Sequence, residues 1–369
     1  MRQARSSICQ SKMWDSRRRA RTLVAGTTLV AGTMLVAAGL TPSASFADEG
    51  GVSFWLPGLY GSLAAVPASA PGWELGTFFY NTSVHAGADV AAAREITIGR
   101  FNPTLNVSLS ASLNADVPLL FVNPTYVFAT PFLGGQASVG MGGGVGYSRT
   151  SLSGTVTASI PPFSFVRSDS ITDAVTGFGD LFPQASVKWH QGVNNFMIYG
   201  TGDIPVGTYN STSLANLGIG HGAADGGVGY TYLDPTTGHE FSAVAGFTYN
   251  LVNPSTNYKN GIDFHLDWGA SQFLSKQVLL GLVGYVYDQI TGDSGSGDRV
   301  GPFESRVIGV GPQVGYLFPI GDMQGYLNLK AYGEFDARNR ASGVNAWLTF
   351  GISPAAPPAA MPTTPMYRK

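Results

Sequence analysis

The sequence predicts an all-β protein, a transmembrane antiparallel up-and-down β-barrel of twelve strands with short periplasmic turns and longer extracellular loops. Between residues 73 and 352, segments of about ten to sixteen residues alternate apolar and polar side chains, and the gaps between them are alternately short and long. That rhythm is typical of outer-membrane barrels, whose turns are tight on one side of the membrane. An export signal precedes these segments.

Composition argues against an ordinary soluble domain. Charged residues make up 12% of the 369-residue chain, whereas about 25% is usual. The 49 glycines follow no period of three and stand among aromatic and β-branched residues, which excludes a collagen-like chain. No stretch after residue 47 reaches the roughly 18 to 20 apolar residues of a membrane helix, so a membrane-spanning chain of this kind must close its sheet.

Residues 1–47 are predicted to be a secretory signal peptide. Four arginines between residues 17 and 21 precede an apolar stretch from Leu23 to Leu40, and Ser45-Phe46-Ala47 follows. This order predicts cleavage near Ala47 and localisation in a Gram-negative-type outer membrane. The alternative is an uncleaved helical anchor, which the glycines and threonines within the apolar stretch disfavour.

Charge and cysteine content limit the partners. Residues 1–47 contain seven basic residues and one acidic residue, so the mature chain has 14 basic and 22 acidic residues and a net charge of −8. Such a surface does not favour nucleic acid. Cys9, the single cysteine, lies in the signal peptide. The expected partners are outer-membrane lipid, a small-molecule solute and the outer-membrane assembly machinery, with no cofactor; the sequence leaves the oligomeric state open.

Ten strands can be placed by reading back from the end of the chain. They are predicted at 343–352, 322–337, 303–318, 277–290, 261–273, 239–250, 223–233, 195–206, 177–190 and 135–150. A strand from Gly72 to Val84 and another ending at Thr130 bring the number to twelve. Residues 85–116 fit a long outer loop, an extended strand or an extra hairpin, and the hairpin would make fourteen strands. Residues 151–176, 207–222, 251–260 and 291–302 are predicted to be the longer connections.

Period two assigns the faces of the strands. In the strand 239–250, Phe241 and Phe247 share one face, opposite Glu240 and Thr248. A Lys or Arg that faces lipid at the bilayer centre costs about 2 to 4 kcal/mol, so the polar rows are expected to face an enclosed lumen. A soluble β-sandwich would alternate too, but its exposed face would carry more Lys and Glu than this chain has.

Several short motifs resemble those of a known family. They are Gly177-Phe178-Gly179-Asp180-Leu181, Asp203-Ile204-Pro205-Val206-Gly207-Thr208-Tyr209, Asn216-Leu217-Gly218 and Gly311-Pro312-Gln313-Val314-Gly315-Tyr316. Over residues 52–352 the chain resembles the outer-membrane proteins of the MetA-pathway of phenol degradation family. The resemblance implies a barrel that transports small molecules linked to aromatic breakdown. Where the family commonly has Pro-Thr-Gly, this chain has Pro205-Val206-Gly207.

The candidate site is the lumen. Residues predicted to line it and tune selectivity are Asp180, Lys188, Asp203, Asp263, His265, Asp267, Asn328, Lys330 and Glu334. The same rows could instead brace a narrow barrel. Residues 48–72 form an N-terminal segment that either stays in the periplasm or enters the lumen as a plug through Phe54, Trp55 and Leu56. Residues 353–369, rich in Pro and Ala, are expected to be a disordered tail outside the barrel 73–352.

The predicted function is passive uptake of small hydrophobic or aromatic compounds through an outer-membrane channel. One alternative is a structural or adhesive barrel without transport. A second is a barrel hydrolase, for which His239 and Ser242 are the nearest pair, although no GxSxG motif supports it. The five histidines have no metal-binding spacing, so neither an enzyme nor a metal site is expected.

Overall fold

The computed structural model describes residues 53–86, 107–160, 163–298 and 304–355. Within these ranges there is no helix long and apolar enough to cross a membrane. The strands are β1 (Gly72–Ala86), β2 (Val107–Val127), β3 (Gln136–Ile160), β4 (Phe163–Gln191), β5 (Asn194–Asp203), β6 (Ala223–Leu233), β7 (His239–Asn250), β8 (Ile262–Phe273), β9 (Val278–Gln289), β10 (Arg306–Ile320), β11 (Met323–Arg338) and β12 (Ser342–Pro354).

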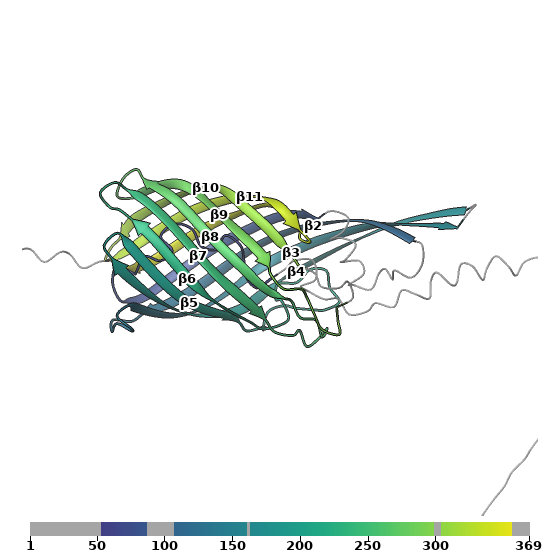
Figure 1. Cartoon of the computed structure of the whole chain (residues 1–369), viewed down its shortest axis with the longest axis horizontal. Coiled ribbons are helices and arrows are strands. Elements are labelled where there is room, and N and C mark those ends of the chain that lie inside the picture. Colours follow the sequence, from purple (N-terminus) through teal and green to yellow (C-terminus); the bar gives the residue numbers. More distant parts are fainter. Residues whose placement is uncertain (1–52, 87–106, 161–162, 299–303, 356–369) are drawn as a thin grey trace, which may run out of the picture. The chain divides into compact units, whose positions relative to one another are not determined.

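These strands form a closed antiparallel barrel in which each strand pairs with its neighbours in sequence (Figure 1). β1 closes the barrel by pairing with β12, from Leu75 opposite Ile352 to His85 opposite Ser342. Closure leaves no strand edge without a partner in the described wall, as a lipid environment requires. The prediction of a twelve-stranded up-and-down barrel is confirmed, and the fourteen-strand alternative is not.

The region 85–116 extends the two strands on either side of it. β1 continues to Ala86, β2 begins at Val107, and Leu113 pairs with Ala86. Residues 87–106 lie outside the described residues, as do the predicted signal peptide 1–47, its cleavage site near Ala47 and residues 356–369. The first two residues of the predicted tail belong to the barrel, because Ser353 and Pro354 pair with β11. Pro354 is tolerated there because it ends the strand.

The prediction of a long loop at 151–176 is wrong. β3 and β4 run through this region and pair with each other as far as Ile160 opposite Phe163, and they extend beyond the other strands in Figure 1. Hydroxyl side chains bond across the strands there, for example Ser151 to Thr172 at 3.0 Å. Such cross-strand pairs stabilise the sheet. One face of this extension carries hydroxyl side chains, while the other mixes the apolar Leu152 and Ile171 with Asp169 and Asp173, so apolar alternation is weaker here than in the other strands.

The inward and outward faces follow the predicted register. Leu282, Leu329 and Phe247 are about half exposed on the outer surface, whereas Asp263 and Asp267 are at most 1% exposed inside. A row of charged groups therefore lies within the barrel, as the desolvation cost of the opposite register requires.

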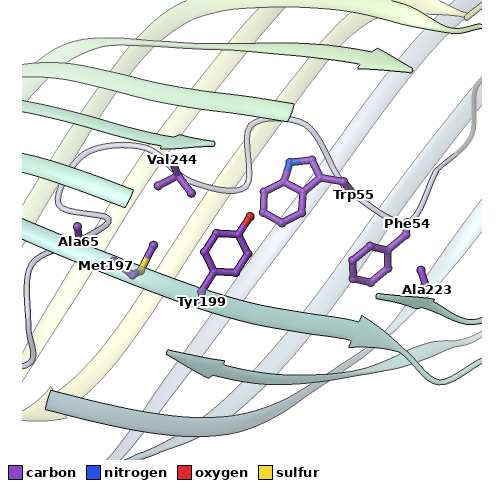
Figure 2. Packing of buried hydrophobic residues seen from close by; sticks show 7 residues of the cluster. All are labelled: Phe54, Trp55, Ala65, Met197, Tyr199, Ala223 and Val244. Atoms are coloured by element: carbon purple, nitrogen blue, oxygen red, sulfur yellow. The ribbon is translucent and has the colours of Figure 1, made fainter. Parts of the chain in front are cut away.

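The chain before β1 lies inside the barrel. Residues 53–71, here called the inserted segment, pack against inward side chains of β5 and β7 (Figure 2). Phe54 and Trp55 are buried in one apolar cluster with Met197 and Tyr199, and Leu56 packs against a second cluster. The chain's own N-terminal part thus occupies part of the lumen.

Candidate functional site

Two charged side chains hold the inserted segment against the β8 to β11 part of the wall. The Asp267 carboxylate accepts the backbone N–H groups of Gly58 at 2.9 Å and Tyr60 at 3.1 Å. The Lys330 ammonium donates to the carbonyl oxygens of Gly58 at 2.6 Å and Leu59 at 2.9 Å. Such charge-assisted bonds are about twice as strong as neutral ones. Residues 58–60 are therefore the most firmly anchored part of the segment.

A second group of contacts continues along the segment. Glu240 on β7 accepts the Ser62 hydroxyl at 2.5 Å and the Leu63 N–H at 2.9 Å. Gln313 on β10 donates to the Ser62 hydroxyl at 2.6 Å. The wall at this point has Gly269, where a Cβ atom would lie 2.7 Å from the Ser62 backbone nitrogen. Only glycine lets the segment approach β8 this closely.

The last part of the segment crosses to the opposite wall. Lys188 on β4 donates to the Val66 carbonyl at 3.2 Å, and the Gln136 side chain pairs with the backbone of Ala68 through bonds of 2.7 and 3.2 Å. From there the chain enters β1 at Gly72. Its path thus runs from the β8 side of the lumen to β3 and β4.

Trp55 occupies a slot between aromatic side chains. Its indole stacks on the His265 imidazole with ring centroids 3.6 Å apart and planes 14° apart. Tyr60 and Tyr199 flank the indole at 5.9 and 6.1 Å. The His265 Nε2 atom lies 3.0 Å from the Asp225 carboxylate and 3.3 Å from the Tyr199 hydroxyl. Four elements of the lumen, namely the inserted segment, β5, β6 and β8, therefore define this slot.

Two of the predicted residues lie near the long loops. Asp180 accepts the backbone N–H groups of Gly207 at 2.7 Å and Ile219 at 2.8 Å, and so fixes the 204–222 connection over the lumen. Glu334 accepts the Tyr285 hydroxyl at 2.6 Å. Both carboxylates line the cavity at this end. Each one braces the structure and borders open space.

The other predicted residues are spread along the wall. Asp263 accepts a bond from Asn250 at 2.8 Å, Asn328 donates to the Val314 carbonyl at 3.2 Å, and Asp203 is buried at the end of β5. The structure therefore brings Lys188, His265, Asp267 and Lys330 to the inserted segment and leaves the remaining five elsewhere on the inner wall. Whether any of them selects solutes stays a prediction.

Sequence reasoning missed several residues of this site. Asp225, Tyr199 and Gln313 were not included among the predicted lumen residues, although each is at an inward-facing position of its strand. Extending the alternation of inward and outward residues to every strand would have identified them. The predicted pair His239 and Ser242 does not form a dyad, because Ser242 bonds Glu240 at 2.5 Å and Thr231 at 2.7 Å, while His239 is exposed. Over the described ranges, no group of three or more His, Cys, Asp or Glu residues is placed to hold a metal ion.

Three cavities lie inside the barrel. The loop-side and middle cavities lie chiefly along β1 to β5, whereas the turn-side cavity is lined by β1, β2, β10 to β12 and the β6–β7 and β8–β9 turns. The loop-side cavity has a volume of about 280 Å³, the middle cavity about 300 Å³ and the turn-side cavity about 810 Å³. The loop-side and middle cavities share the lining residues Phe54, Leu56, Phe121 and Phe182. The middle and turn-side cavities share Glu74, Asn123 and Thr125.

Three phenylalanines stand where the loop-side and middle cavities meet. Phe182 lies 5.8 Å from Phe54 and 6.0 Å from Phe121 between ring centroids. These three residues, from the inserted segment, β2 and β4, are called the aromatic constriction. Its apolar rings line both cavities.

Outside the wall, two loops meet at a buried carboxylate. Asp293, between β9 and β10, accepts bonds from the Tyr258 hydroxyl, from the Gly261 N–H at 3.1 Å and from the Gln289 amide at 2.6 Å. Burial raises the pKa of Asp293 to about 6 in spite of these donors. The connection 251–261 and the residues 290–298 that follow β9 are therefore joined by a group that titrates in mildly acidic conditions.

The closed barrel with a polar, segment-filled interior defines an outer-membrane β-barrel protein. The chain belongs to the MetA-pathway of phenol degradation family, whose sequence profile matches residues 111–350. The comparison with curated proteins gave no match.

Solved structures share the fold. An outer membrane channel from Pseudomonas putida F1 is 13% identical, with a TM-score of 0.53, and the alignment covers 81% of this chain and 100% of that one. A FadL homologue from Pseudomonas aeruginosa is 10% identical, with a TM-score of 0.33, and the alignment covers 85% of this chain and 98% of that one. At this identity the first likeness shows the fold alone, and the second is too distant to add to it.

Proposed function

We propose that the barrel is a passive outer-membrane channel for small hydrophobic or aromatic solutes. The observation that carries this proposal is the chain of three cavities, which share lining residues from the loop end to the turn end. In outer-membrane barrels the short turns face the periplasm, so a solute would enter through the loop-side cavity and leave through the turn-side cavity.

The chemistry of the lining supports apolar solutes. Leu119, Phe121, Phe182 and Ile219 face the loop-side cavity, and the inserted segment adds Phe54. An apolar pocket with a few polar groups is typical of a site for a small organic ligand. Asp180 and Glu334 at its border supply those polar groups.

The aromatic constriction supports discrimination against ions. A narrow apolar passage loses its water easily, and a hydrated ion that enters it loses hydration without any compensating ligand. A neutral aromatic molecule loses little hydration and gains ring contacts with Phe54, Phe121 and Phe182. We therefore expect low ion conductance together with measurable passage of neutral aromatics.

Polar groups guide the path beyond the constriction. Glu74 faces the middle and turn-side cavities, and Lys188 lines the middle cavity. These groups, with the other predicted lumen residues, would set which solutes pass. Three earlier steps are part of the same proposal. Residues 1–47 direct export, the outer-membrane assembly machinery folds the barrel, and residues 48–72 enter the lumen.

Uptake into lipid vesicles tests the function. Vesicles that contain the folded barrel should admit phenol faster than empty vesicles, and faster than vesicles with an unrelated barrel of equal protein content. A charged solute of similar size, such as benzoate, should enter more slowly. Equal rates with and without the protein would favour the structural or adhesive alternative, and esterase activity lost on Ser242→Ala would favour the hydrolase.

A further inference from the structure

The Trp55 slot has the features of a ligand site that the chain fills with its own side chain. A flat bicyclic ring lies between an imidazole and two tyrosines, and it is 2% exposed. In Figure 2 the indole lies beside Tyr199 inside the barrel wall. Aromatic rings stacked in this way can hold a planar ligand through its face.

Trp55 does not satisfy the polar groups of the slot. The indole Nε1–H is buried and has no hydrogen-bond partner among the described residues, and the same is true of His265 Nδ1 and Asp225 Oδ1. Buried indole N–H groups usually have a partner. Buried polar atoms left unsatisfied in a native structure often mark a functional site. The slot therefore contains an occupant of suitable shape with incomplete hydrogen bonding.

Trp55, which occupies the slot, belongs to the part of the inserted segment that makes fewer hydrogen bonds to the wall. The charge-assisted bonds from Asp267 and Lys330 begin at Gly58, whereas Trp55 is held chiefly by ring contacts. The middle cavity, about 300 Å³ in volume, is lined by Trp55 itself and by Tyr60 and Tyr199. Space that can receive the displaced indole thus adjoins the slot, on the proposed solute path.

We propose that neutral aromatic solutes with a hydroxyl or N–H donor bind in the Trp55 slot in place of the indole and so release residues 53–56 from the wall. This inference rests on the proposed channel function and names its solute class and its gate. The solute ring stacks on His265 and its donor reaches Asp225, so the solute gains a bond that Trp55 lacks. That differential affinity is what allows a ligand to shift the equilibrium towards the open arrangement.

The charges around the slot select against anions. Asp225 contacts His265 directly, and Asp267 lies on the same strand two residues beyond it. An aromatic carboxylate placed there would meet Asp225 across a dry interior, where like charges repel strongly. Phenol and indole should therefore bind, while benzoate should not. Cyclohexanol, which has the hydroxyl but no aromatic ring, should bind much more weakly than phenol.

Thiol labelling tests the displacement without measuring transport. In a Cys9→Ser background, Ser53→Cys places a thiol at a position that is 6% exposed and adjacent to the slot. Phenol at ten times its dissociation constant should raise the labelling rate roughly tenfold, because the released population grows by the factor 1 + [L]/Kd. The matched control is Ala65→Cys on the anchored half, where the rate should stay unchanged.

A second measurement covers the case in which Ser53→Cys folds poorly. Trp55→Ala empties the slot, so phenol and indole should raise the unfolding temperature of this variant, read from heat-modifiable gel migration. Trp347→Ala removes an equally buried indole from the lumen away from His265, and phenol should not stabilise it. Benzoate and cyclohexanol should stabilise neither variant.

Several results would overturn the proposal. The Ser53→Cys variant could show unchanged labelling at saturating phenol and still pass phenol into vesicles. That result would refute binding in the Trp55 slot while supporting the channel function. Equal effects of phenol and cyclohexanol, or equal stabilisation of Trp55→Ala and Trp347→Ala, show simple filling of space. Phenol-dependent labelling without vesicle uptake supports the slot and refutes the channel.

Discussion

Asp267 on β8 and Lys330 on β11 bind opposite sides of the same short stretch of backbone, the carboxylate taking the N–H of Gly58 and the ammonium its carbonyl oxygen. Gly58 has a φ of +87°, which glycine adopts readily and other residues rarely do. A Cβ atom there would also lie 2.9 Å from the Tyr332 ring. The charged side chains of the inner wall thus hold the inserted segment in place by hydrogen bonds to its backbone N–H and carbonyl groups.

Lys330→Met should loosen the inserted segment and leave the barrel folded. The substitution keeps the length of the side chain and removes bonds to Gly58 and Leu59, each worth about 1.5 to 3 kcal/mol when one partner is charged. Loss of one such bond raises the released population roughly ten- to hundred-fold. Single-channel recordings should show longer and more frequent openings than wild type. Lys276→Met in the β8–β9 turn is the control, and loss of heat-modifiable migration in Lys330→Met would instead make Lys330 a brace of the wall.

Removing residues 53–66 should open the lumen. The barrel closes through backbone pairing of β1 with β12, to which these residues do not contribute, so heat-modifiable migration should persist. Conductance should rise by a large factor, because the segment and its contacts occupy the centre of the lumen. A second variant replaces residues 53–66 by a Gly/Ser sequence of equal length. It loses the hydrogen bonds to the wall but keeps the backbone in the lumen, so comparing the two variants distinguishes these two effects. Unchanged conductance in both variants would show that the segment does not obstruct the path.

Phe182→Ala should make the channel permeable to ions. The change removes the ring that contacts both Phe54 and Phe121, so the aromatic constriction widens and stays wet. Conductance in potassium chloride should increase while the preference for phenol over benzoate falls. Phe182→Leu, which keeps the passage apolar, should stay close to wild type. A similar increase in both variants would mean that the constriction acts through its packing rather than its dryness.

Asp293 should make the contact between two loops dependent on pH. Because its folded pKa lies above the unfolded value, at about 6, the protonated form favours the joined loops. The contribution is complete below about pH 4 and is lost as the pH rises through 6, by on the order of 2 to 3 kcal/mol. Protease cleavage in residues 251–305 should therefore be faster at pH 7.5 than at pH 4.5. Asp293→Asn should flatten this dependence, with a protease active at both values.

Leu282→Arg should destabilise the folded barrel by about 2 to 4 kcal/mol, because it places a charge on the lipid-facing side near the middle of β9. The free energy of unfolding in lipid vesicles, measured by denaturant titration, gives the value. Leu251→Arg, one residue beyond the end of β7, should cost only about 0 to 1 kcal/mol because the charge reaches the interface. Equal losses at the two positions would contradict the assigned membrane face.

Sequence determined the barrel and its faces. Alternation along β7 and β8 identified Phe241 and Phe247 as outward and Asp263, His265 and Asp267 as inward, because each strand carries its own register in a period of two. Alternation did not identify the extended part of β3 and β4, where one face carries hydroxyl groups and the other mixes apolar and charged residues. The presence of Phe54 and Trp55 in an apolar N-terminal segment suggested a plug, without indicating which wall would hold it.

Only the tertiary structure decided what the inward charges bind. Gly58 is 209 residues from Asp267 and 272 from Lys330, and no local pattern links positions so far apart. Barrel closure brings β8 and β11 to the same side of the lumen and leaves the loop-side and middle cavities along β1 to β5. Which side chains of a strand face inward depends on that strand alone, so the sequence predicts it. The position of the inserted segment depends on the whole closed wall, so the sequence does not.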